Sequence, residues 1–464
     1  MVDMRTMLSR AVMNGVISRV GRGFTAQVRR ELRAFGRAQW RPYAQLRELQ
    51  LEGVNRLLSH CVRTVPYYRR MHVQGLLPDR IGRLEELSQV PTLSKETLVA
   101  QGEEFVSSTV APGALLPRRS GGSTGEPLHF FITPHAAAVM AACEHYGNSL
   151  AGHCVGDPIA TLWGSRFDNA PPTFRQRAAR YLSNITQCVV DRMDEAVCRD
   201  IVRRLERQKP TVLVGYTAAL MEMAAFLEDR GLRPNFPKRS VISAAEPLTP
   251  SQRQTLERVF GRSVFNRYGT REVGLVAMEC SYHRGLHLNG HSLYVEFEPV
   301  AGLGDARRVI VTKLFEMGMP FIRYDLGDYI LGDVSACPCG RGFPIIQAVR
   351  GRVVSNLRLP NGAFIAPEVF IVLLDRQSVR EYRVVQAADY SARVEIVPGP
   401  HWDDTMAQHV LRTLHGVTLG LVEFRIELRE RVERTPSGKL LPIVSHVPSP
   451  VETAPLAWEA IRAA

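Results

Sequence analysis

The centre of the chain alternates between short runs of apolar, β-branched residues and longer amphipathic segments. Between residues 211 and 269, the runs TVLVGY, SVISAAEPL and SVFNRYG predict strands, and the segments between them, TAALMEMAAFLEDRG and TPSQRQTLERVFG, predict helices. Upstream, DPIATLWG (157–164) predicts another strand. Strands and helices that alternate at this spacing predict a parallel sheet with helices packed on it, so the expected fold class is α/β.

The flanking regions complete an expected division of the chain. Residues 43–90 read as helical and include a turn-rich VPYYRRM; HFFIT predicts a strand, 134–150 a helix, and 290–335 antiparallel strands. After a break near RGRVVSN, the strand-like runs EYRVVQ, ARVEIV and FRIELRE surround a helix near 403–415, which indicates a small α+β domain. We expect a basic amphipathic segment (1–41), a large domain (42–350) and a small, mobile domain (351–464).

Charge and cysteine content narrow the functional classes. The net charge is +12, but residues 1–41 contribute +7 of it through nine Arg and two acids, and no basic stripe with interleaved aromatics follows. This pattern argues against nucleic acid binding. The basic segment is compatible with a helix packed on the body, with peripheral contact to an anionic membrane surface, with an acidic partner or with a targeting peptide. Eight scattered cysteines in a long chain indicate a reducing cytoplasm.

A loop rich in glycine and hydroxyl groups precedes the strand HFFIT. Gly121, Gly122 and Gly125 permit close backbone approach, and Ser120, Ser123 and Thr124 add donors, which suits a polyphosphate. Neither the Walker A pattern nor the Rossmann pattern is present. Taken alone, the loop is a weak signal, because Gly/Ser turns are common.

The loop is the first of an ordered series of motifs: SGGSTGEP, AAEP, YGTRE, RYDLGD, GR and TPSGK. In this order they resemble the adenylate-forming superfamily of acyl-coenzyme A synthetases, adenylation domains and luciferases. VPYYRRM and CPCGR are similar to the phenylacetate–coenzyme A ligase branch and its capsule-biosynthesis relatives. The resemblance covers roughly residues 55–445. It implies that ATP and a carboxylic acid give an acyl-adenylate and pyrophosphate, and that the acyl group then passes to a thiol or an amine.

The resemblance also implies roles for individual residues. Residues 120–125 would wrap the β- and γ-phosphates, with Thr124 nearest, while Glu272 would hold Mg²⁺ and Asp328 would accept hydrogen bonds from the ribose. Arg352 would mark the hinge and reach toward the nucleotide. Glu246, Tyr268 and Gly269 would flank the adenine, and their neighbours Ala245, Pro247 and Thr270 are also expected to bind the nucleotide.

Lys439 ends the TPSGK motif and is one of only five lysines among 58 basic residues. A compact ammonium on a flexible stem can bridge the attacking carboxylate and the α-phosphate. The alternative is that PSGK is a turn followed by a surface lysine. With the other motifs present, we assign Lys439 to catalysis together with Glu272 and Thr124. The small domain would bring it to the nucleotide by rotating about Gly351–Asn356.

The chain departs from the family pattern at three places. Glu126 stands where many relatives carry Lys, Asp325 replaces a basic residue of the RYRTGD pattern, and Ser355 and Asn356 replace the usual hinge acid. These departures bear on the rate and on the acyl acceptor. Because of them, the acyl acceptor could be an acyl-carrier protein or an amine in place of coenzyme A. A second alternative is that the chain is a non-catalytic relative that only binds the nucleotide.

Two further expectations concern a metal and the acyl pocket. Cys280, His287, Cys337 and Cys339 form a tetrahedral set suited to structural zinc, with His283 as the competing imidazole and unligated thiols as the alternative. The acyl pocket is expected near the 140s, 163–165, 215–217 and 243–245. Its small or aromatic side chains favour an apolar or aromatic acid. Homodimer formation stays open.

Overall fold

The structure is a computed structural model. It describes residues 24–111, 113–120, 128–164, 173–174, 180–181, 183–190, 193–300, 305–347, 349–352, 357–361, 364–365, 370, 373–374, 379–399, 401–433 and 440–447. Within these residues the chain divides into two compact units, the first made of 24–299 and 305–349, the second of Val300 and 350–447. None of the helices in this part of the chain is long and apolar enough to cross a membrane.

Side chains cap several helices of the first unit at their N-termini. Thr249 caps α10 with a reciprocal capping box to Gln252. The helices are α2 (Phe24–Ala38), α3 (Tyr43–Thr64), α4 (Pro66–Val73), α5 (Lys95–Ala100), α6 (Pro134–Leu150), α8 (Glu195–Gln208), α9 (Thr217–Asp229) and α10 (Pro250–Phe260), with 3₁₀ helices η2 (Leu84–Gln89) and η3 (Gly102–Phe105).

The expected turn at VPYYRRM is wrong, because this stretch forms most of α4. Pro66 occupies the first helical turn, where a missing N–H costs no hydrogen bond and the fixed φ suits the helix. The proline therefore starts a helix here instead of breaking one.

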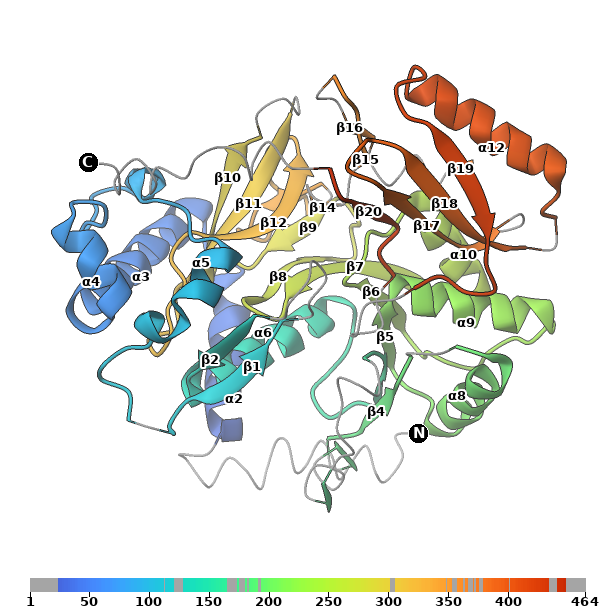
Figure 1. Cartoon of the computed structure of the whole chain (residues 1–464). Helices are drawn as coiled ribbons and strands as arrows, with labels where there is room; N and C mark the ends of the chain where they lie inside the picture. The colour runs from blue at the N-terminus through green and yellow to red at the C-terminus, as the bar shows by residue number, and fades with distance from the viewer. Residues whose placement is uncertain are drawn as a thin grey trace. The chain divides into compact units, whose positions relative to one another are not determined.

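An eight-stranded sheet forms the centre of the first unit, in the order β13-β9-β8-β7-β6-β5-β3-β4. Figure 1 labels β4 to β9 of this sheet. Strands β4, β3, β5, β6 and β7 run parallel, and β8, β9 and β13 continue antiparallel. The strands are β3 (Ile159–Leu162), β4 (Ile185–Cys188), β5 (Val212–Tyr216), β6 (Ser240–Ala244), β7 (Ser263–Thr270), β8 (Gly274–Glu279), β9 (Leu286–Leu288) and β13 (Ile345–Ile346).

Helices cover the parallel part of this sheet. α8, α9 and α10 share one apolar cluster with β3, β5, β6 and β7, in which Leu213, Leu220 and Leu256 are fully buried. α6 packs against β8, and α2 packs on α6, where Phe35 and Tyr146 stack with ring centroids 5.6 Å apart. The predicted α/β fold class is confirmed.

The first unit also contains smaller antiparallel sheets. One is the hairpin β1 (Leu116–Arg119) and β2 (His129–Ile132). Another has β10 (Leu293–Pro299), β11 (Ala306–Lys313) and β12 (Tyr324–Leu331) as consecutive neighbours. The strand β14 (Val349–Arg352) spans the boundary between the units.

The second unit is the small α+β unit that the sequence predicted. Its main sheet has the order β19-β18-β17-β20, and α12 (Asp404–Val417) packs on β19 (Figure 1). The strands are β15 (Leu357–Arg358), β16 (Phe364–Ile365), β17 (Val379–Gln386), β18 (Ala392–Pro398), β19 (Phe424–Leu428) and β20 (Ile443–Ser445).

Candidate functional site

Ser120 closes the β1–β2 hairpin at the start of the glycine-rich loop. Its backbone N–H donates to the carbonyl of Leu128 at 2.9 Å, and its Oγ accepts from the Leu128 N–H at 2.8 Å. The two ends of the loop are therefore held together. Gly121, Gly122, Ser123, Thr124, Gly125 and Glu126 lie outside the described residues, so their phosphate contacts stay predictions.

Glu246 is held at the amino end of α9. Its Oε2 accepts from the N–H of Ala218 at 2.7 Å, which satisfies one of the free donors of the helix terminus. Ala245, just after β6, has φ +68°, a left-handed conformation that is unusual for alanine. Thr217 adds a link across the strand ends, because its Oγ1 lies 2.7 Å from Oγ of Ser243. The AAEP motif, Pro247 included, thus lies at the carboxyl ends of β5 and β6.

Tyr268 and Asp328 meet although 60 residues separate them in the sequence. The Tyr268 hydroxyl donates to Oδ2 of Asp328 at 2.8 Å, and Asp328 is buried. At the next position, a Cβ on Gly269 would come within 2.6 Å of the Gly274 carbonyl, so only glycine fits. The Thr270 Oγ1 accepts from the Val273 N–H at 3.3 Å and tightens the turn. The structure therefore brings the YGTRE and RYDLGD motifs into one site.

Glu272 follows β7 and is buried, as is Lys313 at the end of β11. Burial lowers the pKa of Lys313 to about 8, while the carboxylates of Glu316 and Glu272 act to raise it. The Lys313 Nζ lies 5.1 Å from the ring centroid of Phe321. Sequence reasoning missed this buried ammonium, although a lysine within the β-branched run VIVTK was a usable signal. Glu272 offers the hard oxygen ligand that Mg²⁺ takes.

Asp325 does not carry an unmatched negative charge into the site. Its Oδ2 accepts from Nη1 of Arg308 at 3.1 Å, and its Oδ1 accepts from the Gly327 N–H at 2.8 Å. Burial nevertheless raises the pKa of Asp325. Arg308 on the neighbouring strand therefore offsets part of the charge of the acid at this family position, and it also pairs with Glu298.

The positions of the Lys439 and Arg352 side chains relative to the other predicted site residues are not described. Lys439 lies outside the described residues, and of Arg352 only the backbone, at the end of β14, is described. Their proposed roles rest on the motifs alone.

The predicted metal ligands come together at the edge of the eight-stranded sheet. Cys280 follows β8, His287 lies on β9, and Cys337 and Cys339 precede β13. Their ligand atoms all lie within 4.8 Å of one another, and the sulfurs of Cys280 and Cys337 are 3.8 Å apart. Three of the four side chains are buried. A compact set of three sulfurs and one imidazole matches a closed tetrahedral zinc site.

The orientation of His287 suits a metal ligand. Its Nδ1 lies 2.8 Å from the carbonyl of Phe343, which can only accept, so Nδ1 carries the proton and Nε2 keeps its lone pair. That Nε2 lies 3.3 Å from Sγ of Cys339. Burial also lowers the pKa of His287, which keeps the ring neutral.

The competing imidazole of His283 is engaged elsewhere. Its Nδ1 lies 3.2 Å from Oε2 of Glu279, and Glu279 also accepts two hydrogen bonds from Arg253. His283 therefore belongs to this ion-pair group, and His287 is the better candidate for the fourth ligand.

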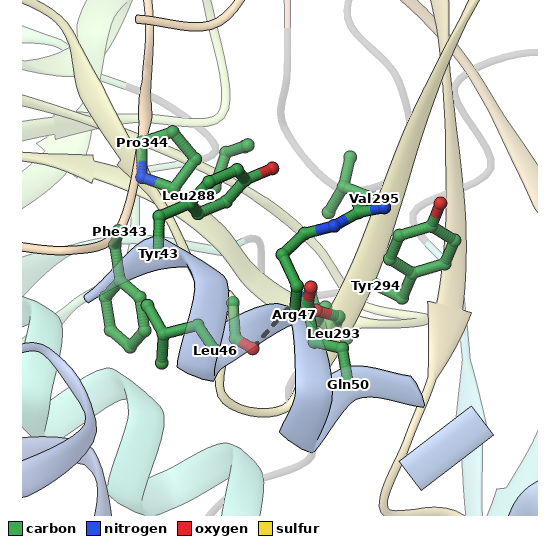
Figure 2. Close-up of a pocket in the computed structure, with 11 residues that line it drawn as sticks. Tyr43, Leu46, Arg47, Gln50, Leu288, Leu293, Tyr294, Val295, Phe343 and Pro344 are labelled. Atoms are coloured by element: carbon green, nitrogen blue, oxygen red, sulfur yellow. Dashed lines mark hydrogen bonds between the residues drawn. The ribbon is translucent and has the colours of Figure 1, made fainter. Parts of the chain in front are cut away.

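A small cavity lies between α3 and the region of β9 and β10, and none of the proposed nucleotide-binding residues lines it. Its volume is about 30 Å³, and Figure 2 shows Tyr43, Arg47 and Tyr294 around it. Gln50 donates to the carbonyls of Gly290 and Leu293 at its edge, both at 3.0 Å. The volume admits one or two waters, not a nucleotide or an acid.

Comparison with known proteins places these observations in a family context. No family model matches the chain. It is 25% identical to the phenylacetate–coenzyme A ligase of Thermus thermophilus over 356 residues, which cover 74% of this chain and 79% of that protein. It is 21% identical to the CapK protein of Staphylococcus aureus over 286 residues, 61% of this chain and 62% of CapK. The chain thus spans less than two thirds of the length of CapK.

A solved structure shares the fold over nearly the whole chain. The 2-hydroxyisobutyryl-coenzyme A ligase in its postadenylation state, in complex with R3-HIB-AMP, has a TM-score of 0.72 and 17% identity, and the match covers 92% of this chain and 94% of that one. At this identity the likeness establishes the fold.

Proposed function

We propose that the chain is an AMP-forming acid ligase of the adenylate-forming superfamily, in the branch of the phenylacetate–coenzyme A ligases; the likeness to these ligases and to CapK supports this. It activates a carboxylic acid with ATP and then transfers the acyl group to a thiol such as coenzyme A. The observation that carries the proposal is the hydrogen bond between Tyr268 and Asp328, which joins two distant motifs beside Glu272.

The first half-reaction forms a mixed anhydride. A carboxylate oxygen of the acid attacks the α-phosphorus of ATP, the bond from this phosphorus to the β-bridging oxygen breaks, and pyrophosphate leaves with the electron pair. The attacking carboxylate and the phosphates are both negative, so the site must supply positive potential and orientation. Lys439 would bridge the two reacting groups. Mg²⁺, when bound, neutralises part of the phosphate charge, and Glu272 would hold it.

The nucleotide would be held by the described motif residues. Glu246 and Tyr268 would flank the adenine, and the buried Asp328 would accept hydrogen bonds from the ribose hydroxyls. The residues from Ser120 to Gly125 would wrap the outer phosphates. The hydrogen bond from Tyr268 would orient the Asp328 carboxylate, a group whose oxygens can accept from the sugar hydroxyls.

In the second half-reaction a thiolate sulfur attacks the acyl carbon. The bond from this carbon to the phosphate oxygen breaks, and AMP leaves. The names of the relatives and of the solved structure, all coenzyme A ligases apart from CapK, support coenzyme A as acceptor. The pairing of Asp325 with Arg308 supports an active enzyme over a degenerate relative, because the unusual acid is electrostatically matched.

The experiment that tests the proposed function is ATP–pyrophosphate exchange with a panel of carboxylic acids. Exchange that depends on the acid, followed by thioester formation when coenzyme A is added, is the expected result. If exchange is followed by amide formation or by loading of a carrier protein, the acyl acceptor is an amine or a carrier protein and not coenzyme A. Protein that binds ATP yet exchanges with no acid would contradict the proposal.

We expect Asp328→Ala to raise the KM for ATP by about 10- to 100-fold, because a hydrogen bond to a charged group contributes about 1.5–3 kcal/mol. ATP titrations in the exchange assay measure this. With 2′,3′-dideoxy-ATP, which lacks the hydroxyls, the same substitution should cost much less.

The matched control is Asp333→Ala, an exposed acid five positions later that pairs with Arg307. It should leave both titrations unchanged. An equal loss with ATP and with the dideoxy nucleotide would show that Asp328 maintains the site and does not bind the ribose.

A further inference from the structure

Arg267 is a largely buried cation in the middle of β7, opposite Ala244 at the carboxyl end of β6, and no motif accounts for it. Its side chain is only 12% exposed. Nη1 donates to Oε1 of Glu144 and to Oδ1 of Asn148 on α6, both at 3.4 Å. Nε and Nη2 make no hydrogen bond to any residue that the structure describes. A guanidinium in this position keeps donors that a ligand can use.

The contacts that Arg267 does make are weak. Charge-assisted hydrogen bonds are normally about 2.7–2.9 Å long, shorter than the two contacts of Nη1. The Glu144 side chain is 61% exposed, so solvent screens its pairing with Arg267. A guanidinium that is mostly removed from water and poorly paired costs free energy unless another acceptor is supplied.

The surroundings of Arg267 are those expected for the acyl pocket. Its Cζ lies 5.8 Å from the ring centroid of Trp163, which follows β3. The Trp163 ring lies in turn 4.3 Å from the Tyr216 ring at the end of β5. Arg267 thus links α6 to an aromatic pair, and both were expected to line the pocket. The residue after it, Tyr268, contacts the proposed ribose-binding Asp328.

We propose that Arg267 is a specificity residue that binds an oxygen acceptor on the part of the acid remote from the reacting carboxyl group. The substrate class is an aromatic carboxylic acid that bears a hydroxyl or carbonyl oxygen. The Trp163–Tyr216 pair fits a flat ring.

This proposal rests on the proposed function, and it is tested by pairs of acids that differ in one oxygen. The pairs are phenylacetate against its three ring-hydroxylated isomers, and benzoate against its three. In the exchange assay, wild-type protein should favour at least one hydroxylated acid by about 10- to 100-fold in kcat/KM, the effect of one hydrogen bond to a charged group. Arg267→Leu should bring that ratio close to one.

Two further variants sharpen the test. Arg258→Leu is the matched control, since Arg258 is an exposed arginine that also pairs with a glutamate, Glu228, and it should keep the wild-type ratio. Arg267→Lys keeps the charge but loses the planar fork of donors, so its ratio should lie between those of wild type and Arg267→Leu. It also keeps the test open if the leucine variant does not fold.

The outcomes separate this inference from the proposed function. Three results would overturn the role of Arg267: wild-type exchange that favours no hydroxylated acid, a wild-type ratio that persists in Arg267→Leu, and an equal loss of activity with both acids of a pair. An equal loss would place Arg267 at the reacting carboxylate. Acid binding by calorimetry provides the second readout. If no acid supports exchange but hydroxylated acids still bind wild type more tightly than Arg267→Leu, the proposed function fails and the role of Arg267 stands.

Discussion

Replacement of Lys439 with alanine is expected to slow adenylate formation by a factor of about 10²–10³, the usual cost of removing one preorganised contact to a developing charge. ATP binding should be nearly unchanged, because the nucleotide would keep its contacts to Tyr268, Asp328 and the glycine-rich loop. The physical reason is that negative charge accumulates on the α-phosphate only as the carboxylate attacks. ATP–pyrophosphate exchange measures the rate, and equilibrium titration measures ATP affinity.

The same variant can be examined in the second half-reaction. With chemically prepared acyl-adenylate and coenzyme A, Lys439→Ala should lose much less activity, because no carboxylate then approaches the phosphate. The control is Lys238→Ala, which removes an exposed lysine just before β6, at the opposite end of that strand from the AAEP motif, and should change neither rate. Unchanged exchange in Lys439→Ala would refute its catalytic role and leave TPSGK as a surface turn.

Strands that are buried on both faces were the easiest part of the fold to predict. TVLVGY and SVISA read as continuous apolar runs, and they form β5 and β6 with every residue buried. β4, a short edge strand with the sequence ITQC, gave no such signal because half of it is polar. The sequence of α8 does contain a helical signal. Its buried residues recur at helical spacing: Cys198, Ile201, Val202 and Leu205. That helix was missed although the pattern was available.

The candidate site could be predicted only where a motif carried it. Glu246, Tyr268, Glu272 and Asp328 were found from short sequence patterns. Arg267 was not, because its environment depends on Trp163 and α6, which lie more than 100 residues away in the sequence. The pairing of Asp325 with Arg308 likewise follows from the antiparallel register of β11 and β12, which the sequence shows only as two alternating runs.

Protein purified without chelator is expected to contain one zinc per chain, bound by Cys280, His287, Cys337 and Cys339. The double substitution Cys337→Ser with Cys339→Ser removes two of the three thiolates and should abolish zinc binding. It should also lower the free energy of unfolding by about 4 kcal/mol or more, an effect of the size reached when a metal site is lost. Elemental analysis and denaturant titration measure the two effects.

The large expected effect follows from where the ligands lie. Cys280, His287 and the CPC segment come from three separate parts of the sheet edge, and the metal would tie β8, β9 and β13 together. β13 is only two residues long, so its hydrogen bonds alone hold that edge weakly. Gly285 permits the close approach, since a Cβ there would come within 2.6 Å of the Ile346 carbonyl.

A control substitution distinguishes loss of metal from loss of any cysteine. Cys154→Ser removes an exposed free thiol and should keep both zinc and stability. A chelator should destabilise wild-type protein but not the double variant, because the latter has no metal to lose. Folded, active wild-type protein with a zinc content near zero would refute the site. The set would then be three reduced cysteines and a histidine that bind no metal.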